Sequence, residues 1–178
     1  PRAISRDAVS FLLNSVQEDI SARYGFHWPV RGILDRNYGE TRVPYIPSVI
    51  FESLSHQNYI DMAYGHNPDF KFTMARAVYK SLLKHLCFVN GQEFVVQPLP
   101  VSHFSMSLSE DAKEVTLRWR PVNDPQEPTA KPRRYVVYTR KGDGGFDNGV
   151  VADKNSIVLP VEKGVLYGFK VTALNDGG

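Results

Sequence analysis

Two helical patterns enclose one short apolar run in the first ninety residues. From Ser5 to Tyr24 apolar side chains recur at helical spacing, and Gly25 follows as a stop signal. The apolar positions are Val9, Leu12, Leu13, Val16 and Ile20. The pattern predicts an amphipathic helix.

A second helix is predicted to begin at Asn67-Pro68, because asparagine favours the N-cap and proline is tolerated in the first turn. It is predicted to end near Asn90-Gly91, since glycine commonly follows the last helical residue. Its apolar residues predict one buried stripe, which consists of Phe72, Ala75, Tyr79, Leu82, Leu83 and Leu86.

Between the two helices lies the stretch "PSVIFESLSHQN", residues 47–58. Its apolar centre, Val49 to Phe51, is uninterrupted and is followed by the carboxylate of Glu52. Such a run predicts a strand covered on both faces, as in a parallel sheet with helices on either side. Residues 1–92 are therefore predicted to form an α/β domain.

The pattern changes after residue 101 to short alternating runs separated by turn-rich stretches. The runs cover residues 114–119, 134–140, 156–161 and 167–174. This pattern of alternating runs and turns is typical of an antiparallel β-sandwich, so residues 102–178 are predicted to form one. Pro98 and Pro100 predict a stiff linker at residues 93–101.

Composition narrows the class of protein. A chain of 178 residues that is 42% hydrophobic and 22% charged predicts a soluble globular protein with one or two cores. The formal charge of +2 does not favour a nucleic-acid partner. No apolar run approaches the roughly 20 residues of a membrane helix, and no leader-like segment is apparent. Cys87 is the single cysteine, which excludes an internal disulfide and predicts a core thiol.

Glu52 is the first candidate for chemistry. A carboxylate at the carboxyl end of a buried strand lies where α/β sheets place their ligands, so Glu52 is a candidate base. It could equally cap the following turn or pair with an arginine. His56 could join a metal site, although a lone loop histidine is more often inert.

Three other features carry little chemistry. The remaining histidines show no metal-ligand spacing with one another or with a carboxylate. The "GDGG" of residues 142–145 lacks the lysine and following helix of a phosphate loop and predicts a hairpin turn. The basic run "KPRR", residues 131–134, is interpreted as solvated surface.

The second half resembles a fibronectin type III domain over nearly all of its length. The resemblance rests on Trp119 at the end of the second strand, Tyr135 and Tyr138 on the third, and "YGFKVTALNDGG" as the sixth. It implies that Trp119 fills the centre of the sandwich and that the Tyr167 hydroxyl bonds to nearby backbone. The family's seventh strand, which follows this point, is apparently missing, and that would leave a sheet edge unpaired.

The first half, residues 5–88, is similar to the C-terminal part of zinc-dependent N-acetylmuramoyl-L-alanine amidases. The family's last segment begins with a helix, an Arg-Gly pair and a loop arginine, which correspond here to the first predicted helix, Arg31-Gly32 and Arg42. It continues with a Pro-x-Val-Leu-x-Glu strand, which corresponds to "PSVIFE", and ends with a helix, which corresponds to residues 70–86. Glu52 falls on the family's catalytic glutamate, and Asn58 falls on its asparagine. The sequence departs from the family at residues 53–55 and at His56.

The resemblance implies roles for three residues. Glu52 would be the general base toward a zinc-bound water and would then protonate the leaving amine. Arg42 would help to hold the anionic stem peptide, and Asn58 would belong to the same substrate-binding region. The family's zinc ligands, two histidines and a glutamate, come from segments whose motifs do not occur here. Zinc is therefore expected in a longer parent protein and not in this chain.

Three functions follow as hypotheses. The first is part of an extracytoplasmic cell-wall hydrolase that cleaves the N-acetylmuramoyl-L-alanine amide of peptidoglycan, with this chain inactive by itself. The second is a cell-surface adhesion protein that binds peptidoglycan or another surface glycan through a degenerate amidase-like domain. The third is a polysaccharide-degrading enzyme, because the layout resembles bacterial proteins named as xanthan lyases.

Overall fold

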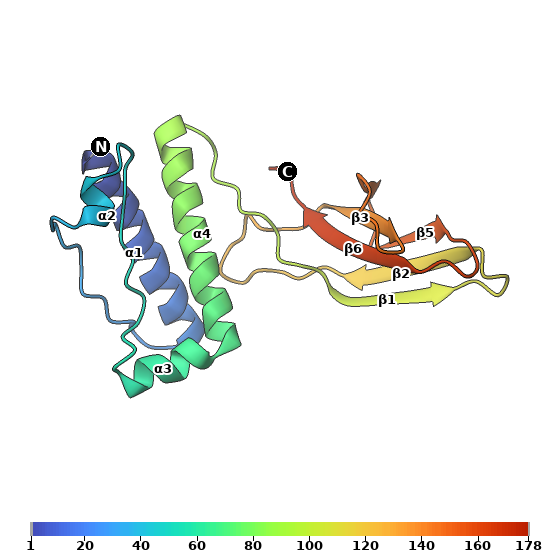
Figure 1. The fold of residues 1–178 in the computed structure, drawn as a ribbon, viewed down its shortest axis with the longest axis horizontal. Coiled ribbons are helices and arrows are strands. Elements are labelled where there is room, and N and C mark those ends of the chain that lie inside the picture. Colours follow the sequence, from blue (N-terminus) through green and yellow to red (C-terminus); the bar gives the residue numbers. More distant parts are fainter. Residues whose placement is uncertain (1, 178) are drawn as a thin grey trace. The chain divides into compact units, whose positions relative to one another are not determined.

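The chain divides into two compact units, Pro1–Phe94 and Val95–Gly178, and the computed structural model describes residues 2–177. The boundary lies inside the segment predicted as the linker. Helices make up the secondary structure of the first unit, and antiparallel strands make up that of the second (Figure 1).

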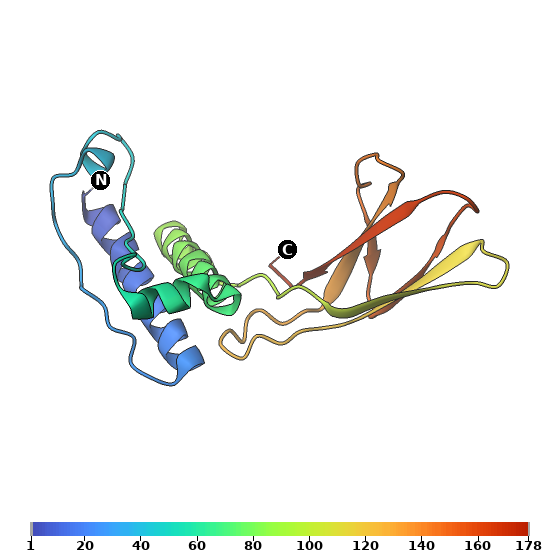
Figure 2. The ribbon, with the colours of Figure 1, turned by 60° about the horizontal axis from the view of Figure 1, so that its bottom comes forward.

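Two long helices, α1 (Arg2–Tyr24) and α4 (Pro68–Asn90), lie side by side in the first unit (Figures 1 and 2). Gly25 ends α1 with a positive φ of 74°. Asn67 caps α4, and its side-chain oxygen accepts hydrogen bonds from two backbone N–H groups of the first turn. Gly91 ends α4 in the left-handed region. The predicted start and stop signals of both helices are confirmed.

The prediction for the buried face of α4 was wrong. Of the predicted stripe, Leu83 is half-buried and the other five residues are exposed, with Leu82 at 54% and Leu86 at 56%. The residues that α4 buries lie on the opposite face, and half of them are polar or charged. They are Phe70, Thr73, Met74, Ala77, Lys80, Ser81, His85 and Cys87. Hydrophobic periodicity alone therefore predicted the wrong buried face for α4.

A buried ion pair explains why α4 packs its more polar face against α1. The Nζ of Lys80 lies 2.8 Å from a carboxylate oxygen of Asp19 on α1, and the two side chains are 3% and 12% exposed. Apolar residues of both helices, together with Trp28 from the loop after α1, form the core of the unit. They are Leu12, Val16, Ile20, Trp28, Phe70, Met74 and Ala77. Because two buried charges must remain paired, this contact holds the polar face of α4 against α1.

The prediction of a strand in the first unit was also wrong. Within residues 2–94 the structure has two further short helices, α2 (Gly39–Arg42) and α3 (Tyr59–His66), and no strand. The expected strand, Val49 to Phe51, lies in an extended segment that has no paired neighbour within this unit. Apolar character alone does not make a strand, because its backbone groups need a partner strand for hydrogen bonding.

The second unit consists of two antiparallel sheets of three strands each. One sheet has the order β1 (Ser102–Leu108), β2 (Glu114–Arg120), β5 (Ser156–Pro160). The other has the order β4 (Val150–Ala152), β3 (Arg134–Lys141), β6 (Tyr167–Leu174). The four predicted runs coincide with β2, β3, β5 and β6, and β1 and β4 match no run that we identified.

The inner faces of the two sheets share one core. Its buried residues come from β2 on one side and from β3, β4 and β6 on the other. They are Val115, Leu117, Trp119, Tyr135, Val137, Ala152 and Ala173. Trp119 is 3% exposed and meets the ring of Tyr135 edge-on at 5.2 Å. The predicted burial of Trp119 between the sheets is confirmed.

Two smaller predictions are also confirmed. The hydroxyl oxygen of Tyr167 accepts a hydrogen bond of 3.1 Å from the backbone N–H of Glu162. Residues 142–149 form the turn that joins the paired strands β3 and β4. Gly149 has a φ of +76°, and a Cβ at this position would lie 2.4 Å from Val136. The turn therefore requires glycine there.

Replacing Lys80 with methionine should cost about 3 to 5 kcal/mol of the free energy of unfolding, because Asp19 loses its ammonium partner while it remains buried. Urea denaturation measures the loss. The matched control is Arg23→Met, which breaks the half-exposed pair with Asp69 and should cost at most about 1 kcal/mol. Equal losses for both variants would contradict a structural role for the buried pair.

Trp119→Ala should destabilise the sandwich by about 3 to 5 kcal/mol, since it removes a large ring from the shared core. Leu166→Ala serves as the control, because Leu166 is 70% exposed and its loss should change stability by at most about 0.5 kcal/mol. A loss below about 1 kcal/mol for Trp119→Ala would contradict the packing described above.

Candidate functional site

The sequence-predicted site residues lie on and around the extended segment that links α2 to α3. This segment runs alongside α1 in both views (Figures 1 and 2). The backbone N–H of Ser48 donates a hydrogen bond to the Ser5 hydroxyl oxygen of α1. Phe51 and Leu54 pack against the core of the helical unit. The segment is thus held at several points although it belongs to no sheet.

Glu52 is exposed on this segment, next to the packed Phe51. Within the described part of the chain, the structure records no hydrogen bond or ion pair for its carboxylate. Its neighbours Val49 and Ile50 are 37% and 44% exposed. Neither capping nor pairing with an arginine, the two structural roles considered for Glu52, is seen.

Asn58 has a structural role that the sequence did not reveal. Its side-chain oxygen accepts hydrogen bonds of 2.9 and 3.2 Å from the backbone N–H groups of Ile60 and Asp61, which caps α3. The Asp61 carboxylate accepts in turn from the backbone N–H of Ser55. The two side chains tie the segment that carries Glu52 to the first turn of α3.

Arg42 and His56 complete the predicted set. Arg42 lies in the last turn of α2 and is exposed, and His56 lies in an exposed turn just before α3. Among residues 2–177 no recorded hydrogen bond or ion pair joins Arg42, Glu52 and Asn58 to one another. Residues 2–177 also contain no group of three or more His, Cys, Asp or Glu side chains that could hold a metal ion.

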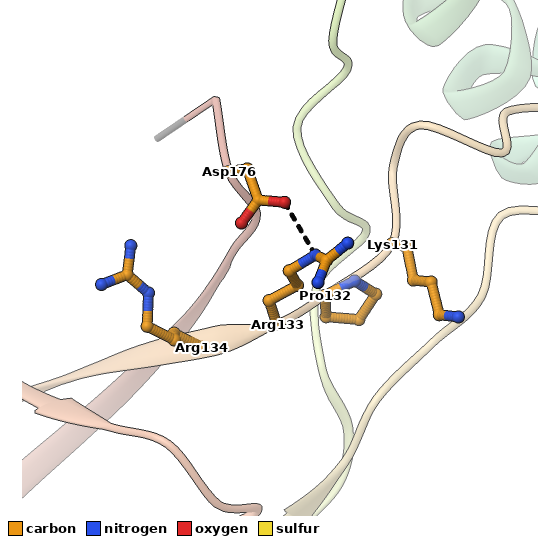
Figure 3. Close-up of a pocket in the computed structure, with 5 residues that line it drawn as sticks. All are labelled: Lys131, Pro132, Arg133, Arg134 and Asp176. Carbon is orange, nitrogen blue, oxygen red and sulfur yellow. Dashed lines mark ion pairs between the residues drawn. The ribbon is translucent and has the colours of Figure 1, made fainter.

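An open pocket of about 510 Å³ lies in the second unit. It is lined by Lys131, Pro132, Arg133, Arg134 and Asp176. Figure 3 shows the Arg133 guanidinium directed toward the Asp176 carboxylate, and the Nε lies 2.8 Å from the nearer oxygen. Both side chains are more than half exposed, so the pair contributes at most about 1 kcal/mol.

This pocket contains the basic run that the sequence analysis interpreted as surface. The run is exposed, as expected, but chain folding adds Asp176 from beyond β6 to it. Three cations against one carboxylate leave an excess of positive charge that attracts anions, and salt screens such an exposed attraction. The sequence signal for the cations was visible, whereas the contribution of Asp176 depends on the fold.

The comparisons with known proteins identify no family. A scan against protein-family models gave no match, and no curated protein sequence matched the chain. A separate finding concerns membranes: no helix in residues 2–177 is long and apolar enough to cross one.

Asn58→Ala should destabilise the helical unit by about 1 kcal/mol, because two backbone N–H groups of α3 lose their acceptor. Asn58→Asp should keep most of the stability, since aspartate caps helices equally well. Urea denaturation measures both, and Gln57→Ala, at an exposed neighbouring position, serves as the control. An Asn58→Ala protein as stable as the control would show that the cap does not stabilise α3.

Proposed function

We propose that the helical unit is part of the catalytic domain of an extracytoplasmic cell-wall hydrolase, and that the hydrolase cleaves the N-acetylmuramoyl-L-alanine amide of peptidoglycan. In this proposal Glu52 is the acid–base group. The second unit is a fibronectin type III-like module that spaces the catalytic domain or binds a surface glycan.

The observation that carries the proposal is the apolar run Val49 to Phe51, which precedes Glu52 in the extended segment. Val49 and Ile50 are apolar and partly exposed, and no strand pairs with them in this unit. A strand-forming run in this state has backbone groups free for a neighbouring strand. This is the state expected of one strand of an amidase-like sheet whose other strands lie in a different segment of the protein.

The surroundings of Glu52 support its role in proton transfer. A general base must be free to accept a proton, and among residues 2–177 no ion pair is recorded for this carboxylate. The adjacent Phe51 and Leu54 pack on the core and so fix the backbone on both sides of Glu52. Asn58, through its cap, anchors the end of the same segment. In the proposal Asn58 is thus a positioning residue as well as a neighbour of the substrate.

The amidase family requires zinc, and the described residues of this chain do not supply a ligand set for it. Glu52 and His56 are close in sequence, but no third donor joins them. We therefore derive no step that involves the metal. The proposal requires its ligands to come from another segment of the protein.

Two features of the sandwich support the proposal for the second unit. Trp119 fills the space between the sheets, and the Tyr167 hydroxyl bonds to the backbone of Glu162. These are the two contacts that the resemblance to fibronectin type III domains implies. The unit's exposed basic pocket offers one surface for an anionic ligand.

The test uses Glu52→Gln in the full-length protein that contains this chain. Peptidoglycan is digested, and the newly exposed N-terminal L-alanine is quantified. The amide keeps the shape of the side chain but cannot transfer the proton, so turnover should fall about 100-fold or more. Folding and zinc content should stay unchanged. Glu40→Gln is the control, because Glu40 is also an exposed glutamate of the helical unit.

Two outcomes would contradict the proposal. A Glu52→Gln protein with near wild-type turnover would show that Glu52 is not the acid–base group. A zinc-loaded wild-type protein without amidase activity would overturn the reaction itself. If such a protein nevertheless co-sedimented with peptidoglycan, the adhesion hypothesis would replace the hydrolase.

A further inference from the structure

The sheet formed by β4, β3 and β6 has basic side chains on its outer face. Tyr135 and its alternate neighbours in β3 point into the shared core. The residues between them, which include Arg134, Tyr138 and Arg140, therefore lie on the outer face. Lys170 of β6 is the register partner of Tyr138 and lies on the same face. The three strands contain no aspartate or glutamate. We call Arg134, Arg140 and Lys170 the outer cations.

The outer cations differ from the basic residues at the two ends of β3. There, Lys141 bonds to Glu162 at 2.7 Å, and Arg133 bonds to Asp176 at 2.8 Å. Among residues 2–177, no ion pair is recorded for any of the outer cations. Figure 3 shows the Arg134 guanidinium directed away from the pair of Arg133 and Asp176. All three outer cations are exposed, so their charge can pair with an anion from outside the chain.

Two of the outer cations are held by neighbouring side chains. The Nζ of Lys170 lies over the ring of Tyr138, 5.6 Å from its centroid. The guanidinium of Arg140 lies over the ring of Phe146 at 5.4 Å. A Cβ at Gly168 would lie 3.1 Å from the Nε of Arg140, so glycine at this position leaves room for the guanidinium. The charges are therefore positioned before any ligand binds, which lowers the entropy cost of binding.

We propose that this outer face binds a linear acidic polysaccharide whose carboxylates pair with the outer cations. From Arg134 to Arg140 the strand extends about 20 Å, a span that one small anion cannot bridge. A chain with repeated carboxylates can contact both ends of β3 and Lys170 at once. The inference rests on the glycan-binding role proposed for the second unit, and it does not depend on the amidase reaction.

The surroundings of the outer cations favour a polysaccharide over other polyanions. Proteins that bind single-stranded nucleic acids stack the bases on open aromatic rings, whereas cations lie over the rings of Tyr138 and Phe146. Extended peptides bind chiefly through backbone hydrogen bonds at the edge of a sheet, not on its face. The hydroxyls of Tyr138 and Thr172 lie on the outer face, and no hydrogen bond is recorded for either within residues 2–177. They can bond to sugar hydroxyls.

The first experiment measures the binding of polygalacturonate to the full chain by isothermal titration calorimetry at low salt. The wild-type protein should bind this polymer, and its affinity should fall as salt is added, because salt screens exposed charges. Monomeric galacturonate and the neutral polymer hydroxyethyl cellulose should give no measurable binding. A wild-type protein that does not bind polygalacturonate would overturn the proposal.

The second experiment locates the binding surface with two triple variants. Each exposed charge pair contributes up to about fivefold in affinity, so replacing all three outer cations by glutamine should weaken binding about 100-fold. The control removes the same charge at the other sheet and should change affinity at most about threefold. Its changes are Lys113→Gln, Arg118→Gln and Arg120→Gln. Circular dichroism checks that both variants are folded. Equal losses would show that net charge, and not this face, causes binding, and would overturn the proposal.

The third experiment tests the class of ligand by competition. Single-stranded DNA and polyglutamate are added to the complex with polygalacturonate at equal charge concentration. Neither should displace the polysaccharide, and displacement by either one would overturn the assignment to acidic polysaccharides. These measurements read binding to a polymer without the peptidoglycan amide, whereas the assay of Glu52→Gln reads turnover. The failure of one proposal is therefore distinguishable from the failure of the other.

Discussion

The buried ion pair between Lys80 and Asp19 determines how the helical unit is built. Leaving either charge unpaired in the core would cost several kcal/mol, so the two side chains must face each other across the contact between α1 and α4. This requirement sets the rotation of α4 about its own axis. It also brings Thr73 and Ser81 inward and turns the apolar face of the same helix outward. The buried pair, together with Phe70 and Met74 on the same face, thus leaves Phe72, Leu82 and Leu86 exposed.

The ends of the long helices could be predicted from sequence, but the face that α4 buries could not. Helix caps and stop signals are local, because they act on the backbone within one turn of the helix end. This holds for the N-cap Asn67 and for the terminating glycines Gly25 and Gly91. The buried face depends on a partner sixty-one positions away in the chain, since Asp19 pairs with Lys80. Periodicity reports which face is apolar, and it does not report which polar residues have a buried partner.

In the sandwich, too, some strands could be predicted from the local sequence and others could not. Alternating runs located β2, β3, β5 and β6, because one face of each of these strands is turned to the core. β1 is exposed along most of its length and β4 has three residues, so neither presents a pattern long enough to recognise. At the candidate site, the sequence singled out Glu52, Arg42 and Asn58. Only the structure revealed that Asn58 caps α3 and that Asp176 joins the basic run.

The helical unit exposes two apolar surfaces, and they call for different kinds of partner. On α4 the backbone hydrogen bonds of the helix interior are satisfied internally, so the exposed apolar face with Phe72, Leu82 and Leu86 can gain stability only by packing side chains against another apolar surface. On the extended segment around Ile50, backbone N–H and C=O groups lack a partner strand, so a neighbouring strand would add hydrogen bonds as well as apolar contacts. The segment therefore carries the proposal of a larger catalytic domain.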